Sequence, residues 1–419
     1  MNQPNLTGDA LPDGSYQSNL PQRHRKGKIW KRLFQASTWV GITALIVLIL
    51  NVINSTFGMI ALENQINPDD LAINNIPIEQ LHKVDLVHIL KENLSLGLIR
   101  RMESEKSWEE RSREEVYDLV VFRVVEPTVV DTWPLYDSLF HRNQIRQEAA
   151  EDHPQAALKF HSWLNSSFLV TPQSPNPEHA GVRTAILGSL WTIAITILFS
   201  FPLGVGAAIY LEEYAADTPL NRLIQTNINN LAGVPSIIYG MLGLAIFVRA
   251  LEHITSGAVF GVVDPTTANG RTVLSAGMTL GLLILPLIII NAQEAIKAVP
   301  SSLRQASYGM GATRWQTVWH HVLPNALPGV LTGAILAISR AIGETAPLVV
   351  VGASTFITFD PKSPFSKFTT LPIQIWQWTA RPQDEFRNIA GAAILVLLGL
   401  LLSLNALAIY LRNKYSTRY

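Results

Sequence analysis

The sequence contains no cysteine. Structural disulfides and thiolate metal sites are therefore excluded, and cysteine usage leaves the redox compartment undetermined. Three catalytic signatures are also missing, namely the G-x-x-x-x-G-K-[ST] phosphate loop, H-E-x-x-H and the G-x-S-x-G elbow. The chain is thus expected to be neither an enzyme nor the holder of a metal or cofactor. Without the phosphate loop, the chain is not expected to hydrolyse a nucleotide itself.

An excess of charge of one sign is absent as well. The 32 basic side chains balance 32 acidic ones, so the overall charge favours neither a nucleic acid nor an acidic partner. Hydrophobic residues make up 48% of the chain, and they are concentrated in long runs without charge. Such runs are typical of membrane spans rather than of a soluble core.

Six of these runs are long enough to cross a bilayer, because about 20 helical residues cover the roughly 30 Å hydrocarbon core. The runs are 33–62, 184–211, 223–248, 272–293, 324–358 (interrupted by two charges) and 388–411. The first follows a basic cluster, as in a signal peptide. Its length and the lack of an A-x-A cleavage site favour an uncleaved span. We therefore predict an all-α membrane protein with six transmembrane helices.

Basic residues near the span ends predict the orientation. The cluster 23–32 places the N-terminus in the cytoplasm, and six spans return the C-terminus to the same side. Basic residues between 362 and 387 argue against this orientation, but the first span usually dominates. The predicted parts are a basic cytoplasmic tail 1–32, a first helix 33–62, an extracytoplasmic insert with linker 63–183, a five-helix core 184–411 with a cytoplasmic loop 294–324, and a cytoplasmic tail 412–419.

The insert is rich in charge and is predicted to be a small, mixed, water-exposed domain. Apolar residues recur at helical spacing in 85–101, and 119–125 resembles a strand. Residues 171–177 alternate proline with polar residues, which predicts a stiff linker.

The loop before the fifth run predicts two short helices at the membrane surface. Ser301 or Ser302 can cap the first helix, Gly311 can adopt the left-handed turn that ends it, and Thr313 can cap the second. Pro324 is expected to end that second helix.

Two tryptophans, Trp315 and Trp319, are four residues apart and share one face of the second helix. On these residues alone, an amphipathic hairpin anchored by tryptophan is as good an interpretation as a docking element.

The spacing of this loop resembles the EAA loop of ABC importer permeases. The matching positions are Gln305, Ala306, Ser307, Gly311, Leu323 and Pro324. Gln305 replaces the usual glutamate, and His321 replaces the usual isoleucine. The resemblance implies that the loop docks in a groove of an ATPase subunit.

Three further segments, 210–215, 230–240 and 339–348, resemble the PstA-type phosphate permease. The resemblance covers about 180–419 and the first span, but not the insert. It implies a MetI-like type I importer core in a bacterial inner membrane. The implied partners are a PstC-like permease, a PstB-like ATPase dimer and an extracytoplasmic PstS-like phosphate-binding protein.

Two charges, Arg340 and Glu344, lie near the middle of the fifth run. A charge there costs roughly 2.5–3.5 kcal/mol on insertion scales, so such residues usually face a water path or the interior of a helix bundle. A guanidinium fits phosphate oxygens, and Glu344 could neutralise it in the empty path. We assign Ser339 and Thr345 to the same substrate path. Pro347 predicts a kink beside the pair. A purely structural ion pair is the alternative.

Other polar or small residues in the spans favour packing roles. The stripe Ser189, Thr192, Thr196 and Ser200 is expected at a helix contact, and Pro235, Gly240 and Gly243 are expected to be packing or kink residues. Glu212 and Glu213 are expected to be solvated unless an ATPase touches them.

Two alternative functions stay open at this point. One is the import of another oxyanion, such as sulfate or molybdate. The other is a membrane receptor or scaffold that works through its insert.

Overall fold

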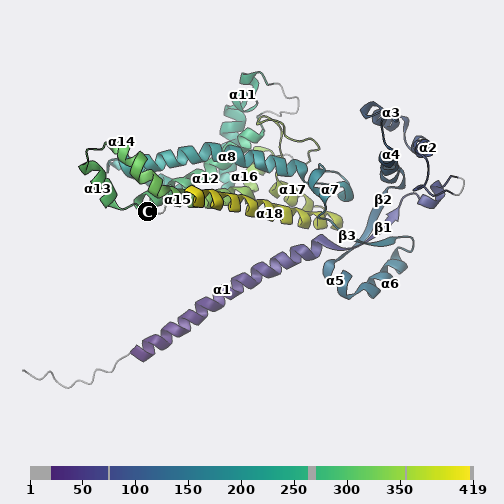
Figure 1. The fold of residues 1–419 in the computed structure, drawn as a ribbon, viewed down its shortest axis with the longest axis horizontal. Helices are drawn as coiled ribbons and strands as arrows, with labels where there is room; N and C mark the ends of the chain where they lie inside the picture. The colour runs from purple at the N-terminus through teal and green to yellow at the C-terminus, as the bar shows by residue number, and fades with distance from the viewer. Residues whose placement is uncertain (1–19, 74–75, 263–269, 354–355, 416–419) are drawn as a thin grey trace, which may run out of the picture. The chain divides into compact units, whose positions relative to one another are not determined.

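The computed structural model describes residues 20–73, 76–262, 270–353 and 356–415. It divides into two compact units, 1–51 and 52–419. The predicted tails lie partly outside the described residues, at 1–19 and 416–419. Helix α1 (Leu20–Thr56) forms the described part of the first unit, and its last turn belongs to the second (Figure 1).

Five helices in the described ranges are long and apolar enough to cross a membrane, and a bent pair supplies a sixth crossing if it counts as one span. The five are Arg23–Thr56, Arg183–Tyr214, Val273–Lys297, Arg314–Gly343 and Asp384–Lys414. The bent pair joins α9 (Pro219–Leu231) to α10 (Ser236–Gly243) and its extension to Ala250, with a bend of 108°.

The bend lies at Pro235, within the span predicted over 223–248, where a packing or kink residue was expected. Pro235 precedes α10 with an extended backbone (φ −54°, ψ 135°). Proline also disfavours a helical conformation in the residue before it, so α9 ends before the proline and a new helix begins after it.

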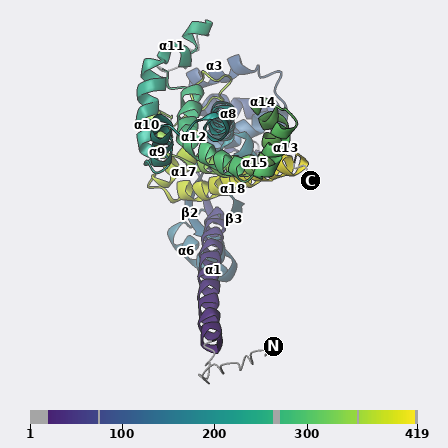
Figure 2. The same ribbon diagram turned by 90° about the vertical axis from the view of Figure 1, so that its left-hand side faces the viewer.

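Helix α12 (Val273–Lys297) packs between α8 (Arg183–Ile209) and α15 (Leu323–Gly343) in the second unit (Figures 1 and 2). Close approach depends on glycine: a Cβ at Gly277 would lie 2.5 Å from Cγ2 of Ile195. The Thr196 hydroxyl donates to the carbonyl of Gly277 across this contact. The stripe Ser189, Thr192, Thr196 and Ser200 is fully buried, in agreement with its packing interpretation.

The remaining helices of the core follow α15. They are α16 (Ala346–Val351), α17 (Leu371–Thr379) and α18 (Asp384–Tyr415). Helix α17 packs on α18, and no predicted run contained it.

The second unit also contains a three-stranded antiparallel sheet of order β2-β1-β3. The strands are β1 (Phe57–Asn64), β2 (Pro127–Pro134) and β3 (Ala157–Ser162). The first span was predicted to reach Leu62, but α1 ends at Thr56 and β1 begins at the next residue. The end of that apolar run forms β1 and pairs with two strands that are distant in the sequence, instead of continuing the span. A local hydrophobic pattern does not reveal such pairing.

Two lobes fill the rest of the insert. The first holds α2 (Lys83–Asn93), α3 (Leu96–Glu105) and α4 (Arg113–Val120) around its own apolar core. The second holds α5 (Leu135–Phe140) and α6 (Arg142–Asp152), and α7 (Ser166–Val170) follows β3.

The strand predicted at 119–125 is wrong. Residues 119–120 end α4, and Val121–Val125 is a π-helical turn. Val116, Val120 and Val124 are buried at helical spacing, and helical burial outweighs the strand preference of valine. The helix expected over 85–101 is also divided, since α2 ends at Asn93 and α3 begins at Leu96.

The segment predicted as a stiff linker is packed against the core. Gln173 is 2% exposed, and its amide bonds Gln377 of α17 and the backbone of Ile357. The proline-rich segment therefore fixes the insert to the helices instead of separating them.

Candidate functional site

The predicted glycine-turn loop is present as two short helices. Helix α13 (Ser301–Gly309) ends before Gly311, whose φ of +85° is in the left-handed region. Helix α14 (Arg314–Thr317) begins with a capping box: the Thr313 hydroxyl accepts from the Gln316 amide, and the Gln316 side chain accepts from the Thr313 amide. The first helix has no such cap, because Pro300 precedes it and no side chain bonds its end.

Pro324 does not end the second helix, contrary to prediction. A π-helical turn, Val318–Val322, joins α14 to α15, and Pro324 falls in the first turn of α15. A proline is tolerated there because the first amides of a helix need no intrahelical acceptor. Residues Arg314–Gly343 consequently form one continuous helix.

The predicted docking residues of the loop differ in their exposure. Gln305, Ala306 and Gly311 are exposed. Ser307 is buried and its hydroxyl lies 2.8 Å from that of Thr317, which fastens α13 to α14. Leu323 and Pro324 are half-buried in α15.

Large apolar side chains are exposed on the same loop. Met310 is 89% exposed, and the rings of Trp315 and Trp319 stack with centroids 5.3 Å apart while both stay more than half exposed. An exposed apolar surface of this kind is typical of an interaction site.

Glu213 connects this loop to the end of α8, contrary to the expectation that it is solvated. It lies in a π-helical turn, Tyr210–Tyr214, and only 7% of its side chain is exposed. Arg304 of α13 donates to its Oε1 from Nη2 at 2.7 Å and from Nε at 3.0 Å. Neighbouring Glu212 is 16% exposed and lies 3.4 Å from Lys297.

Arg304 also donates to the carbonyl oxygens of Val299 and Ile296. It therefore joins α12, α13 and α8 at one point. Sequence inspection missed this junction because 91 residues separate Arg304 from Glu213.

The intramembrane pair lies where α15 is interrupted. The helix ends at Gly343, Glu344 has an extended ψ of 125°, and α16 begins at Ala346 with Pro347 in its first turn. The predicted kink at Pro347 is thus a break of two residues. Nε of Arg340 lies 3.4 Å from Oε1 of Glu344, and their side chains are 47% and 18% exposed.

The two predicted hydroxyl residues lie differently. Ser339 donates to Oδ1 of Asn405 on α18 at 2.7 Å and to its own helix, so its hydroxyl is turned away from the pair. Thr345 lies in the break, half-buried.

Helix α10 of the bent pair closes against this break. A Cβ at Gly240 would lie 2.7 Å from Cα of Pro347, and one at Gly243 would lie 2.1 Å from Oγ1 of Thr279. The contact positions therefore require glycine, in agreement with the packing interpretation. Tyr239 packs beside Ala337 and Ala341 of α15, which brings the bent pair next to the charged residues.

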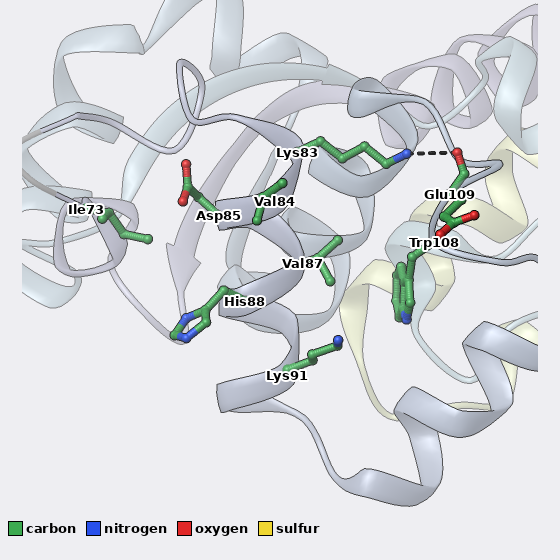
Figure 3. A pocket seen from close by; sticks show the side chains of 9 residues that line it. All are labelled: Ile73, Lys83, Val84, Asp85, Val87, His88, Lys91, Trp108 and Glu109. Carbon is green, nitrogen blue, oxygen red and sulfur yellow. Dashed lines mark hydrogen bonds between the residues drawn. The ribbon is translucent and has the colours of Figure 1, made fainter.

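A hollow of about 620 Å³ opens on the first lobe of the insert, beside α2 (Figure 3). Trp108 forms one wall, and Lys83 donates to the carbonyl of Glu109. Its lining also contains Asp85, His88 and Lys91, so opposite charges are mixed and no ligand class is favoured. In the described ranges, no group of three or more His, Cys, Asp or Glu residues is placed to hold a metal.

The apolar helices and the glycine-turn loop define a multi-pass membrane protein. Residues 200–415 match the model of the family described as "Binding-protein-dependent transport system inner membrane component". The chain belongs to this family, which confirms the importer-permease class predicted from the loop.

Curated relatives agree with this membership. The probable ABC transporter permease protein YqgI of Bacillus subtilis is 32% identical over 58% of this chain and 83% of its own. The phosphate transport system permease protein PstC of Pasteurella multocida is 34% identical (59% and 80%), and PstA of Yersinia pestis is 33% identical (59% and 79%). The resemblance to the PstA-type family is thereby confirmed.

Among solved structures, a chain of the inward-facing MetNI methionine ABC transporter is 19% identical. It superposes with a TM-score of 0.43 and covers 57% of this chain and 96% of its own.

Proposed function

We propose that this chain is the PstA-like permease subunit of an ATP-driven importer of inorganic phosphate. The path would form together with a homologous PstC-like permease. The family membership supports the importer, and the names of the PstC and PstA relatives support phosphate as its substrate. The identities to the PstC and PstA relatives are similar, so they do not decide between the two permease types. The segment 344–348 favours the PstA type.

Arg340 is the observation that carries the substrate proposal. It is a cation in the last turn of the apolar helix α15, yet nearly half of its side chain is exposed. In the part of the chain that the structure describes, only its Nε bonds another side chain, at a long 3.4 Å. The two terminal nitrogens can therefore present a planar pair of donors to phosphate oxygens.

Glu344 acts as the counter-ion of Arg340 in the empty path. It cannot attract an anion itself, but a neutralised arginine costs less to keep at membrane depth. Arriving phosphate takes over the guanidinium and displaces the carboxylate. The break at Glu344 and Thr345 supports this role, since irregular backbone at membrane depth is tolerated where it lines a cavity or is buried in protein.

The exposed loop from α13 to α14 docks on a separate ATPase, a PstB-like dimer, which supplies the energy without a cofactor in this chain. The exposed Gln305, Ala306 and Met310 form its contact surface, and Gly311 gives it shape. The loop and both termini are cytoplasmic in this proposal. The insert is extracytoplasmic, on the side from which a PstS-like binding protein delivers phosphate.

The proposal is tested by uptake of labelled phosphate into cells or vesicles that contain the complete importer, with unlabelled phosphate, sulfate or molybdate as competitor. Only phosphate should compete in the micromolar range. Stronger competition by sulfate or molybdate would assign the path to that oxyanion. Two results together would instead favour a receptor or scaffold: phosphate uptake that is unaltered when this chain is removed, and the absence of an ATPase that copurifies with it.

A further inference from the structure

The short helix α5 of the insert turns its large apolar side chains outward. Tyr136, Leu139 and Phe140 are 58%, 63% and 71% exposed. They are spaced i, i+3 and i+4, so they share one face of the helix, and the rings of Tyr136 and Phe140 lie 5.0 Å apart. We call these three residues the α5 patch. Phe160 on β3 is a further exposed ring, at 53%.

Helix α5 is held in place by polar contacts on its other side. The hydroxyl of Ser138 is buried and accepts from the backbone amide of Met59 on β1. The same hydroxyl donates to the carbonyl of Pro134. Ser138 thus attaches α5 to the sheet through the polar side of the helix, and the apolar face is turned outward.

The last turn of α1 is bonded directly to α5. The backbone amide of Tyr136 donates to Oδ1 of Asn54 at 2.7 Å. Asn51 and Asn54 are the side-chain amides nearest the C-terminal end of α1, in the part of the run 33–62 that follows Leu50. The sheet begins at Phe57, one residue after the helix ends, so no linker separates α5 from the end of the span.

Aromatic side chains are enriched at this level of a membrane protein, where lipid headgroups meet the acyl chains. A helix with one apolar face lies in that plane with the face directed into the lipid. Arg142, which begins α6 two residues after Phe140, is exposed and can reach lipid phosphates. The charge and the apolar face thus complement a phospholipid surface.

We infer that the α5 patch inserts into the lipid interface at the C-terminal end of α1 and anchors the insert to the bilayer. This anchor is independent of which solute the permease carries. It keeps the sheet, and the two lobes attached to it, at a fixed height above the membrane. The exposure of the α5 patch alone would also allow it to bind a protein partner. The following experiment distinguishes a protein partner from lipid.

The chain has no native cysteine, so single spin labels report one position each. Cysteines replace Leu139 and Phe140 in the patch, Val47 in the apolar run as the lipid reference, and Glu151 at the exposed end of α6 as the water reference. The full importer is placed in nanodiscs of phosphatidylethanolamine and phosphatidylglycerol. The accessibility of each label to oxygen and to nickel-EDDA is then measured.

Labels at 139 and 140 should show an oxygen-to-nickel ratio severalfold above that at 151 and approach that at 47. A ratio equal to that at 151 overturns the inference. Protection that appears only when the binding protein is added assigns the patch to a protein partner and overturns it as well. Phosphate uptake by each labelled variant shows independently that the protein is folded and active.

A second variant pair tests the anchor without labels. Phe140→Ser should reduce the protection of the insert against proteolysis in nanodiscs, whereas the matched Gln147→Ser, an exposed change on α6, should not. Equal proteolysis rates for both variants and the parent would contradict an anchoring role.

Discussion

The guanidinium of Arg304 bonds the carboxylate of Glu213 from two of its nitrogens, although the residues are 91 positions apart. The contact joins α13, which belongs to the proposed docking loop, to the π-helical end of α8. Both side chains are largely removed from solvent, at 19% and 7% exposure. In the proposed importer, a force applied to α13 by the ATPase would therefore pass directly to a membrane span, and the pair would act as a positioning element of the coupling.

Glu213→Gln should destabilise the permease, because it leaves the charge of Arg304 without its partner. Breaking a buried pair typically costs about 3–5 kcal/mol, and the residual exposure of Arg304 puts the expected loss near the lower end. The melting temperature of the purified complex and the ratio of phosphate moved to ATP hydrolysed should both fall. Lys297→Gln breaks the neighbouring, more exposed pair with Glu212 and should cost below about 1 kcal/mol. Equal losses in the two variants would contradict the special role of Arg304.

Gly311→Ala should weaken ATPase docking. The space around Gly311 is open, so the cost comes from its φ of +85° alone and is about 1–3 kcal/mol. Gly309 offers a matched control, since a Cβ there also meets open space but its φ is not positive. Gly309→Ala should therefore preserve copurification of the ATPase. Gly311→Val, which places a bulkier side chain at the position with positive φ, should largely abolish that copurification. Normal uptake by Gly311→Val would refute the docking role of the loop.

Arg340→Gln should abolish phosphate uptake while the complex still assembles with the ATPase. Arg340→Lys should rescue only part of the uptake, since an ammonium lacks the paired donors of a guanidinium. Glu344→Gln removes the competitor for Arg340, so phosphate should bind but be released slowly.

The double variant Arg340→Gln with Glu344→Gln separates transport from structure. If the pair were only structural, each single change would leave one charge alone, and the double change would restore both stability and uptake. We expect restored membrane abundance without uptake. Full uptake by the double variant would disprove the transport role of Arg340.

Accessibility of two introduced cysteines checks the proposed orientation. Both positions are exposed, Ser104 in α3 of the insert and Ser302 in α13. Ser104→Cys should react with an impermeant thiol reagent added outside intact cells, and Ser302→Cys should react only after permeabilisation. The reverse pattern would invert the orientation.

The first lobe of the insert should be removable. Its apolar core is separate from that of the helices, and its ends meet where the Gln65 amide donates to the carbonyl of Val125. Deleting 66–125 with a short linker should leave insertion and phosphate uptake intact. Deleting 157–172 should not, because Trp163 and Phe168 belong to the same core as Trp378 and Phe386 of the permease. Loss of membrane insertion in the first deletion would show that the lobe is structural.

Features that depend on neighbouring residues could be predicted from sequence. The turn at Gly311 and the cap at Thr313 need only a few consecutive side chains, and both are present. The Arg304–Glu213 contact could not be predicted, because two helix ends meet only after the spans pack. The strand β1 was hidden for a similar reason, since its apolar residues continue the run of α1 and its partners are more than 60 residues away.

The continuous helix Arg314–Gly343 has a mechanical consequence. Its 30 residues make a rod of about 45 Å, with the stacked tryptophans near one end and Arg340 near the other. A tilt of about 5° about the tryptophan end displaces Arg340, which is 21–25 residues away, by roughly 3 Å. That displacement is similar to the 3.4 Å between Nε of Arg340 and Oε1 of Glu344. A rigid lever can thus convert a small rotation at the membrane surface into the opening or closing of an ion pair deep in the bilayer.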